Sequence, residues 1–315
     1  MELKFGDVER TSAAALIGLA LEEDLSDVGD LTSGALIDKD ERAALQVVAR
    51  AAGVLAGGPI AQLVFLRLDP DVCWEAKLPD GSRLQPGDVA AIVSGPLCSL
   101  LTGERTALNF LTHLSGIATL TSQFVDAVRG TGARILDTRK TLPGYRILHK
   151  YAVRAGGGSN HRLGLYDGVL IKDNHLAAWS ETGAGQTIAQ AIEHARHKSP
   201  TGIPIEVEVD TLEQLADALN GRPDIVLLDN MDCDKLRRAV ELRDKTANEV
   251  ELEASGGVSL DTVADIGRTG VERISIGALT HSAPALDLAF DWQGHLPERS
   301  RGSRVESQNK LGSSP

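Results

Sequence analysis

The chain has 315 residues, of which 42% are hydrophobic, so it can bury a full core and form about two domains or one large α/β unit. Its formal net charge of -12 argues against a general nucleic-acid partner or a membrane-surface partner. Cys73, Cys98 and Cys233 lie far apart without C-x-x-C spacing. This pattern favours buried free thiols over disulfides or a zinc site.

The N-terminal residues contain no basic stretch followed by an apolar core, so we expect no secretory signal. No apolar run approaches the ~20 residues that a membrane span needs. We therefore expect a cytoplasmic protein with no membrane partner.

The first hundred residues mix helical and strand patterns. Residues 12–23 have helical periodicity, and residues 45–49 and 89–93 read as short strands. A helix is then predicted to start at Pro96, and Ser115-Gly116 is predicted to end it before a second helix.

From residue 134 onward, short apolar runs that end in polar residues alternate with helical patterns. Six such runs are expected as strands, at 134–138, 168–174, 205–210, 224–230, 249–255 and 273–278. Strands that alternate with helices indicate parallel βα units, and polar groups at the strand ends are typical of a β/α barrel. Six strands are too few for a complete eight-stranded barrel, so we predict an α/β fold with an incomplete or seven-stranded barrel.

Two helices of this region have recognisable starts. Thr211 and Gln214 have capping-box spacing, and Ser259 is expected to cap a helix that stops near Gly270. Residues 295–315 are polar and cannot bury enough apolar surface to fold, so a disordered tail is expected there.

Positive charge is concentrated in residues 134–172, which hold eight Lys or Arg residues against Asp137 and Asp167. The segment "DTRKTLPGYR" (137–146) contributes three of these cations directly after an apolar run. A solvated turn would explain one such cluster. A cationic island in an anionic chain, however, is also what capture of a small, multiply charged anion needs.

Inside this island lies "GGGSNHR" (156–162). Three consecutive glycines can form a hinge, but they also let backbone N–H groups approach an anion, and His161-Arg162 follows at once.

Carboxylates recur on three consecutive predicted strands. In "IEVEVD" (205–210) the acids Glu206, Glu208 and Asp210 share one face by period-two alternation, while Asp229 and Glu253 belong to the next two strands. A solvated edge strand is one explanation. The other is a site that handles cations or developing positive charge, because buried carboxylates are costly without a partner.

The stretches "SGG" (255–257) and "SIGA" (275–278) place hydroxyl groups and glycines at two neighbouring strand ends. This combination is typical of a phosphate seat built from backbone amides near a helix start.

Several of these stretches together resemble the quinolinate phosphoribosyltransferase family. The resemblance covers roughly residues 12 to 292 and is carried, in the family's order, by "LEEDLSDVGDLTS", "ERTALNFLTHLSGIAT", "DTRKTLPGYR", "KYAVRAGGGSNHRLGLYDGVLIKDNH", "EVEVDTLEQL", "LLDNM", "EASGGV" and "GALTHSAPALD". It implies an N-terminal α/β sandwich domain over residues 1–114, completed by about 284–294, and a seven-stranded barrel domain over 115–283.

The resemblance also implies an activity. The family joins quinolinate to 5-phosphoribosyl-1-pyrophosphate with Mg²⁺, giving nicotinate mononucleotide, pyrophosphate and CO₂, as a homodimer or larger homo-oligomer with shared active sites. No nucleophilic side chain is needed, so neither Cys98 nor Cys233 is expected to be catalytic.

Residue roles follow by matching the motifs. Quinolinate would be bound by Thr138, Arg139, Lys140, His161 and Arg162, with Arg105 reaching in from the neighbouring subunit. Lys172, Glu208 and Asp229 would face the phosphoribosyl pyrophosphate, and the two carboxylates would hold Mg²⁺ directly or through water. Lys140, Lys172, Glu208 and Asp229 would be catalytic. The 5-phosphate would be seated by Ser255, Gly256, Gly257, Ser275 and Gly277.

Two positions depart from the family pattern. Ser159 stands where an apolar residue is expected, and Arg273 precedes the last strand where an aromatic residue is more usual. Neither is expected to alter a charge in the pocket. The alternatives are a paralogue that acts on another anionic ring and a non-catalytic scaffold of the same fold.

Overall fold

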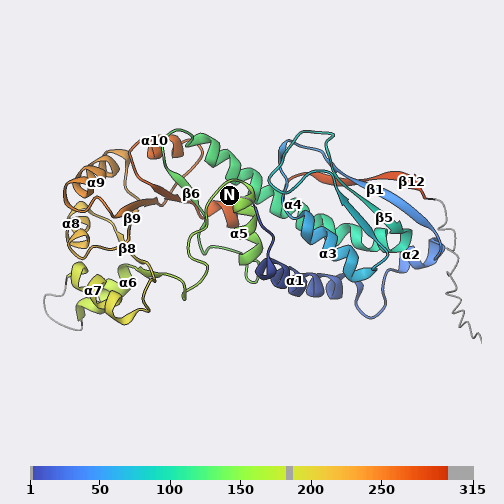
Figure 1. Cartoon of the computed structure of the whole chain (residues 1–315), viewed down its shortest axis with the longest axis horizontal. Coiled ribbons are helices and arrows are strands. Elements are labelled where there is room, and N and C mark those ends of the chain that lie inside the picture. Colours follow the sequence, from blue (N-terminus) through green and yellow to red (C-terminus); the bar gives the residue numbers. More distant parts are fainter. Residues whose placement is uncertain (1–2, 182–186, 297–315) are drawn as a thin grey trace, which may run out of the picture.

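The computed structural model describes residues 3–181 and 187–296. Figure 1 shows an elongated molecule whose two parts lie side by side, one around an antiparallel sheet and one around parallel strands. The long helix α4 (Leu97–Ala127) runs between them and contacts elements of both parts. No helix in the described ranges is long and apolar enough to cross a membrane.

The first part is a four-stranded antiparallel sheet with helices on one face (Figure 1). Its strand order is β12-β1-β5-β3, with β1 at Arg42–Ala49, β3 at Cys73–Ala76, β5 at Val89–Pro96 and β12 at Leu288–His295. Strand β12 returns from the far end of the chain to pair with β1, so both ends of the described chain belong to this part. The strands predicted at 45–49 and 89–93 lie within β1 and β5.

Smaller elements complete this part. They are α1 (Asp7–Leu25), α2 (Leu31–Leu36), β2 (Gly53–Val54), α3 (Gly58–Leu68) and β4 (Arg83–Leu84). Helix α1 contains the helix predicted at 12–23. Phe65 of α3 packs against Trp74 of β3 and Phe290 of β12, which holds the helical layer against the sheet.

Helix α4 is continuous, so the predicted break at Ser115-Gly116 is wrong. The hydroxyl of Ser115 bonds with the backbone of Ala56, accepting from its N–H and donating to its C=O. A side chain at position 116 would place a Cβ 2.1 Å from the Pro284 carbonyl oxygen. Both residues therefore serve close packing in the middle of the helix, and their polar or small character does not end it.

The second part is built on six parallel strands in the order β6-β11-β10-β9-β8-β7. The strands are β6 (Arg134–Leu136), β7 (Val169–Ile171), β8 (Ile205–Val209), β9 (Ile225–Asp229), β10 (Glu251–Ser255) and β11 (Arg273–Ser275). All six lie within the predicted runs. Ser159 forms a parallel bridge to Leu136 beside β6 and so occupies a seventh strand position. The incomplete or seven-stranded barrel is therefore confirmed.

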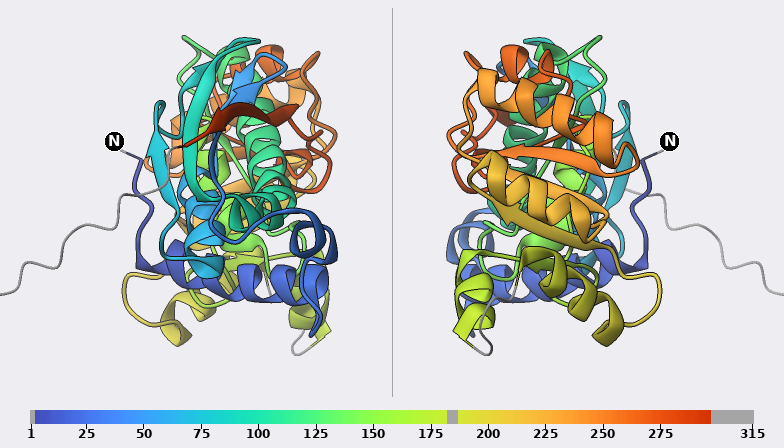
Figure 2. Two further views of the ribbon diagram at one scale, coloured as in Figure 1. Left: turned by 90° about the vertical axis from the view of Figure 1, so that its right-hand side faces the viewer. Right: turned by 90° about the vertical axis from the view of Figure 1, so that its left-hand side faces the viewer.

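Helices alternate with these strands and cover the barrel. They are α5 (Arg146–Ala155), α6 (Asp173–Glu181), α7 (Ile188–Lys198), α8 (Leu212–Asn220), α9 (Cys233–Thr246), α10 (Val263–Gly267) and α11 (Ala278–His281). The right-hand view of Figure 2 shows α8 and α9, in gold and orange, lying over the strands.

The two predicted helix starts have different outcomes. The Thr211–Gln214 capping box is present and begins α8, so that prediction is confirmed. Thr262, and not Ser259, is the N-cap residue of α10, and this helix ends at Gly267, before Gly270. The Ser259 hydroxyl lies 3.2 Å from that of Thr262, so it belongs to the turn that precedes the helix.

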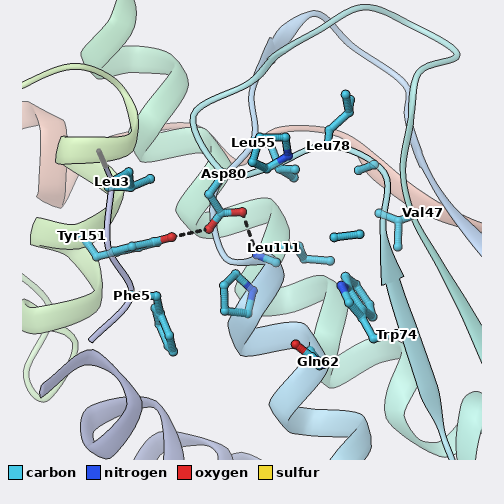
Figure 3. Close-up of a pocket in the computed structure, with 15 residues that line it drawn as sticks. Leu3, Phe5, Val47, Leu55, Gln62, Trp74, Leu78, Asp80, Leu111 and Tyr151 are labelled. Atoms are coloured by element: carbon cyan, nitrogen blue, oxygen red, sulfur yellow. Dashed lines mark hydrogen bonds between the residues drawn. The ribbon is translucent and has the colours of Figure 1, made fainter. Parts of the chain in front are cut away.

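The two parts meet around a cavity of about 250 Å³ that is mostly apolar. Figure 3 shows Tyr151 of α5 reaching across it toward Asp80 of the first part, beside Phe5 and Leu3. The Tyr151 hydroxyl donates to Asp80 Oδ2 at 2.7 Å. Burial raises the pKa of Asp80, although this bond and two backbone N–H groups oppose the rise. A buried hydrogen bond thus joins barrel and sheet.

All three cysteines are free. Cys98 and Cys233 are half-buried, but Cys73 is exposed on the edge strand β3, so the prediction that all three thiols are buried is wrong for it. Of the predicted tail 295–315, residues 297–315 lie outside the described residues, and His295 still belongs to β12.

Candidate active site

A cavity of about 660 Å³ opens at the carboxyl ends of the barrel strands. Every strand from β6 to β11, or the loop after it, contributes to its wall. It is lined by Thr138, Arg139, Lys140, His161, Arg162, Leu170, Lys172, Glu208, Leu227, Asp229, Asn230, Glu253, Ser255, Gly256, Gly257 and Ser275. The structure thus brings together all the predicted site residues except Arg105 and Gly277.

One wall of the cavity is cationic. Arg139 and Lys140 follow β6, and Arg162 lies on the loop that precedes β7. Burial, and then the charge of Arg139, lower the pKa of Arg162. Among the described residues, the buried Nε of Arg139 has no hydrogen-bond partner. Two guanidinium groups with free donors form a site for an anion with more than one carboxylate.

Only part of the cationic island belongs to this wall. Arg134 pairs with Glu251, Arg154 pairs with Glu9, and Arg146 donates to the Leu163 carbonyl. Lys150 is fully buried against Asp137. The island therefore serves two purposes, since four of its cations hold the fold and the others line the cavity.

Asp137 organises the loop beside the pocket, a role that the sequence does not reveal. Its carboxylate pairs with Lys150 and accepts from the His161 backbone N–H at 2.9 Å and from Asn160 Nδ2 at 2.6 Å. Lys150 also donates to the His161 carbonyl at 3.0 Å. This buried pair holds His161 and its neighbours in place from behind.

The three glycines of "GGGSNHR" do not line the cavity. A Cβ at Gly156 would lie 2.3 Å from the Ala118 carbonyl oxygen, and one at Gly158 would lie 2.8 Å from Thr121 and Val153. The glycines therefore allow the loop to pack closely on α4 and α5. Neither the hinge nor the anion contact considered for them is needed to explain them.

The opposite wall carries carboxylates. Strand β8 pairs with β7 and β9, so the edge-strand alternative is wrong. Along it, exposure increases toward the carboxyl end, from the buried Glu206 through the half-buried Glu208 to the exposed Asp210. Glu208 pairs with Lys172, and Asp229 accepts from Asn230 at 2.7 Å. Glu253 also lines the cavity, but its side chain is fully buried.

Two sets of residues could hold a metal ion. The first is Glu208 and Asp229, whose oxygens face a cavity roomy enough for a hydrated ion. Mg²⁺ prefers oxygen ligands and keeps several waters, so it fits this set. The second set is His161, Glu206 and Glu253, whose ligand atoms lie within 4.8 Å of one another. It is deeply buried, includes a nitrogen ligand and already contains the Arg273 charge, so it fits Mg²⁺ poorly.

His161 lines the cavity, but both its ring nitrogens are engaged by the protein. Nε2 lies 3.0 Å from Glu206, and Nδ1 accepts the Arg162 backbone N–H at 2.8 Å. Burial lowers the pKa of His161 and the charges of Glu206 and Glu253 raise it, but the second proton that these carboxylates favour would have to sit on Nδ1, which the Arg162 N–H already occupies. A second proton on Nδ1 would remove the bond to Arg162. The proton on Nε2, between the carboxylates, is therefore the one that this geometry requires.

The prediction about Arg273 is wrong in two respects. Arg273 lies in β11 and does not precede it, and its Nε donates to Glu253 Oε2 at 2.7 Å. It therefore neutralises a carboxylate that lines the cavity. The sequence marks this position only as a departure from the family pattern. Its partner could not be found from the sequence, because pairing across β10 and β11 fixes the contact. Ser159, by contrast, takes part through its backbone alone in the contacts that the structure shows.

The third region of the cavity is the turn after β10. Gly256 and Gly257 have φ values of +92° and +61°, and a Cβ at Gly256 would lie 2.2 Å from Asn230 Oδ1. Ser255 and Ser275 end two neighbouring strands here. Gly277 lies outside the lining set but close by, since its Cβ would be 3.0 Å from Lys140 Cδ. Backbone and hydroxyl donors thus collect at one end of the cavity, as a phosphate seat needs.

Arg105 lies elsewhere. It is exposed on α4, in the half of that helix that packs against the antiparallel sheet, and is absent from the lining of the cavity. Within one chain the structure does not bring it to the other predicted residues.

A cationic wall, carboxylates opposite it and a turn with backbone donors at the open end of a barrel are what a protein that binds several anionic groups together with a cation would need. Comparison with known families makes this specific. The N-terminal domain family of quinolinate phosphoribosyl transferase matches residues 30–115, and the C-terminal domain family matches residues 117–291. The chain belongs to the quinolinate phosphoribosyltransferase family.

Individual relatives agree with this assignment. The nicotinate-nucleotide pyrophosphorylase [carboxylating] of Mycobacterium leprae is 45% identical over 287 residues, covering 90% of this chain and 99% of that protein. The probable enzyme of the same name from Bacillus subtilis is 43% identical over 84% of this chain and 88% of its own. The crystal structure of NadC from Streptococcus pyogenes superimposes with a TM-score of 0.85 at 37% identity, covering 92% and 99% of the two chains.

Proposed function

We propose that this protein transfers the phosphoribosyl group of 5-phosphoribosyl-1-pyrophosphate to quinolinate and removes one carboxylate. The products are nicotinate mononucleotide, pyrophosphate and CO₂, which places the reaction in the biosynthesis of NAD. The names of the relatives describe this reaction from both directions, as a carboxylating pyrophosphorylase and as a decarboxylating phosphoribosyltransferase. The observation that carries the assignment is the cavity, whose lining holds cations, carboxylates and backbone donors in one place.

The cationic wall would bind the dicarboxylate ring. Quinolinate carries two neighbouring carboxylates, and a guanidinium can grip a carboxylate in bidentate fashion. Hydrogen bonds to charged groups are worth ~1.5–3 kcal/mol each, so several are needed to offset the desolvation of two carboxylates. Arg139 and Arg162 offer this, with Lys140 and Thr138 beside them. Arg139 has a free buried donor, so it gains a partner when the anion enters.

The opposite wall would face the sugar donor. As the bond between C1′ and pyrophosphate breaks, positive charge develops on the ribose, and the carboxylates of Glu208 and Asp229 stabilise it electrostatically. The ring nitrogen of quinolinate forms the new bond to C1′. Lys172, which pairs with Glu208, would neutralise the departing pyrophosphate. Ser255, Gly256, Gly257 and Ser275, with Gly277 close by, would seat the 5-phosphate.

Glu208 and Asp229 would hold Mg²⁺, directly or through water. When bound, this ion would neutralise the charge of the pyrophosphate leaving group.

Loss of CO₂ follows from the new charge on the ring. Once the ring nitrogen is ribosylated it is cationic, so it draws the electron pair of the breaking bond between C2 and its carboxylate. C2 then takes up a proton. The chain needs no nucleophile for this step, and Cys98 and Cys233 are not among the residues that line the cavity.

The protein is further proposed to act in the cytoplasm as a homodimer or larger homo-oligomer. Arg105 lies outside the cavity of its own chain, and its exposure on α4 leaves it free to enter the cavity of a neighbour. A site shared between two subunits would give the diacid a third guanidinium.

The test is turnover with defined substrates. Protein mixed with quinolinate, phosphoribosyl pyrophosphate and Mg²⁺ should release CO₂ and form nicotinate mononucleotide in equal amounts. Activity with nicotinate and none with quinolinate would assign another substrate. Binding of both substrates without turnover would show a non-catalytic protein of the same fold.

A further inference from the structure

Four side chains beneath the cationic wall form one continuous chain of contacts that ends at Arg162. Arg273 Nε donates to Glu253 Oε2 at 2.7 Å. The other oxygen of Glu253 lies 3.4 Å from His161 Nε2, and Glu206 Oε2 lies 3.0 Å from the same nitrogen. On the far side of the ring, Nδ1 accepts the Arg162 backbone N–H at 2.8 Å. A residue outside the cavity lining is thus connected to one that forms it.

The contact between Arg273 and Glu253 is important because both side chains are buried. The Glu253 side chain is 0% exposed and that of Arg273 is 13% exposed, so neither can exchange its partner for water. Within residues 3–181 and 187–296, Glu253 Oε1 makes no hydrogen bond, and its 3.4 Å contact with His161 Nε2 is electrostatic. A buried carboxylate without a cation is strongly destabilising. The position and the charge of Glu253 therefore depend on Arg273.

The last contact is important for substrate recognition. His161 Nδ1 can accept the Arg162 N–H only while the ring keeps its orientation, with Nε2 toward the two carboxylates. The Arg162 guanidinium donates to the Gly168 carbonyl at 2.9 Å, and the residue lines the cavity. A bidentate fork tolerates little displacement, so the backbone position of Arg162 affects how well it grips a carboxylate.

We propose that Arg273 is a positioning residue of this site: it holds Glu253, Glu253 and Glu206 hold the His161 ring, and the ring holds Arg162 in place for quinolinate. This inference rests on the proposed function, which assigns quinolinate to the cationic wall. Without Arg273, Glu253 would lack its neutralising partner and the ring would lose one of its two anchors. Arg162 would then lose the acceptor of its backbone N–H.

The test is Arg273→Gln, with steady-state kinetics for both substrates. We expect the KM for quinolinate to rise roughly tenfold, because the loss of a residue that supports a binding group commonly costs about this much. The KM for phosphoribosyl pyrophosphate and kcat should stay within about twofold, since Glu208, Asp229 and the phosphate seat do not touch Arg273. Arg273→Lys, which keeps the charge, should recover part of the affinity for quinolinate.

Arg134→Gln is the matched control. Arg134 pairs with Glu251, which Arg273 also contacts, but it is half exposed and is not among the partners of Glu253. Its removal should leave both KM values unchanged. If Arg273→Gln does not fold, Arg273→Met combined with Glu253→Gln removes both charges together, so no buried charge is left unpaired. The double variant should show the same selective rise in the KM for quinolinate.

Unchanged KM for quinolinate in folded Arg273→Gln would overturn the inference and leave the proposed function intact. A parallel loss of kcat and of both affinities, together with a lower Tm, would also overturn it, because that pattern means a structural role alone. A wild-type protein that does not turn over quinolinate would refute both proposals, and the two kinds of failure are therefore distinguishable.

Discussion

At the scale of single residues, the central feature is two guanidinium groups that face one cavity. Burial and the charge of Arg139 lower the pKa of Arg162, and Arg139 Nε lacks a partner among the described residues. Repulsion between the two cations is relieved when a dianion lies between them. Holding two guanidinium groups at one cavity therefore costs stability, as is common at functional sites.

The planar fork of Arg162 can be tested by Arg162→Lys. Lysine keeps the charge but offers a point contact in place of a bidentate one. We expect the KM for quinolinate to rise roughly 10- to 100-fold, because a hydrogen bond to a charged group is worth ~1.5–3 kcal/mol. The KM for phosphoribosyl pyrophosphate should change much less. Initial-rate kinetics would measure both. Arg237→Lys, in an exposed pair on α9, is the control. Equal effects on both substrates would contradict the assignment.

The sequence predicted which residues gather at the cavity better than it predicted what each does. The charge pattern and the resemblance named all the lining cations. The sequence could not distinguish the lining cations from Lys150, Arg134 and Arg154, which are paired with acids elsewhere in the fold. The partner acids of these three lie far away in the chain or across a turn. Likewise, the cluster of Glu206, Glu253 and Arg273 exists only because β8, β10 and β11 line one barrel. Sequence spacing carries no information on such contacts.

At the scale of elements, the turn after β10 shows how backbone conformation builds part of the site. Gly256 has a φ of +92°, and a Cβ there would lie 2.2 Å from Asn230 Oδ1. Asn230 itself has a φ of +52°, and its N–H donates to the Ser255 carbonyl at 2.9 Å. Two adjoining turns are thus locked together at the end of the cavity where the phosphate is proposed to bind.

Gly256→Ala should therefore impair use of the sugar donor. The strained backbone and the clash would displace donors of the phosphate seat, so we expect the KM for phosphoribosyl pyrophosphate to rise roughly tenfold or more, since small misplacements of binding groups are costly. Gly202→Ala is the matched control, because Gly202 has a φ of +87° but nothing within 4 Å of its Cβ. Gly202→Ala therefore carries the same backbone strain, about 1 kcal/mol, at a position away from the proposed phosphate seat. Equal kinetics in both variants would argue against a phosphate seat at this turn.

Helices α4 and α5 are in contact through a pair of histidines, and this pair should make the stability of the fold depend on pH. His113 Nε2 lies 2.8 Å from His149 Nε2, and His149 is fully buried. Burial, and then the charge of His113, lower the pKa of His149 to about 4. In the unfolded chain a histidine has a pKa of about 6.5. As the pH falls below 6.5, the unfolded chain therefore binds a proton that the folded chain does not, and stability is lost down to about pH 4.

This pair predicts that the free energy of unfolding falls by up to about 1.4 kcal/mol per pH unit between pH 6.5 and 4 on account of His149 alone. Above pH 6.5 the residue should contribute no pH dependence. Urea unfolding across this range should show a shallower slope in His149→Asn than in the wild type. His197→Asn, at an exposed position on α7, should keep the wild-type slope. Identical slopes in His149→Asn and wild type would contradict the account.

The elements themselves were largely predictable, and the failures have identifiable causes. Six short runs predicted the six parallel strands. Strands β7 and β9 are continuously apolar up to their ends, as strands buried on both faces are, whereas β8 and β10 alternate apolar residues with acids. The helix break at Ser115-Gly116 was wrong, because small polar residues look alike whether they end a helix or allow close packing. Only the neighbouring Ala56 and Pro284 distinguish these uses.

At the scale of the whole molecule, the two parts depend on each other. Strand β12, which follows the barrel, completes the sheet of the first part, and Tyr151 of the barrel is bonded to Asp80 of the sheet domain (Figure 3). The resemblance of several motifs in order predicted this architecture more fully than periodicity did. Local patterns alone gave no reason to expect that a strand at 288–295 returns to the first sheet.

Shared active sites are the main prediction at this scale. Arg105→Ala and Lys140→Ala should each be nearly inactive, the first because a neighbour loses a guanidinium and the second because the chain's own cavity loses a cation. Mixed dimers would contain one cavity with both residues intact, so activity should rise toward about one quarter of the wild-type value, as random exchange of subunits requires.

Activity of the mixture would be measured after subunit exchange has been confirmed by mass spectrometry of differently labelled chains. Two batches of the same variant, mixed identically, are the control. Confirmed exchange without any recovery would contradict a site that is shared between subunits.

The most direct test of the account is a crystal structure of the protein with quinolinate bound. We predict that its two carboxylates lie within hydrogen-bonding distance of the Arg139 and Arg162 guanidinium groups, with the ring nitrogen toward Glu208 and Asp229. A diacid found away from these arginines, for example in the cavity between the two parts of the chain, would contradict the account.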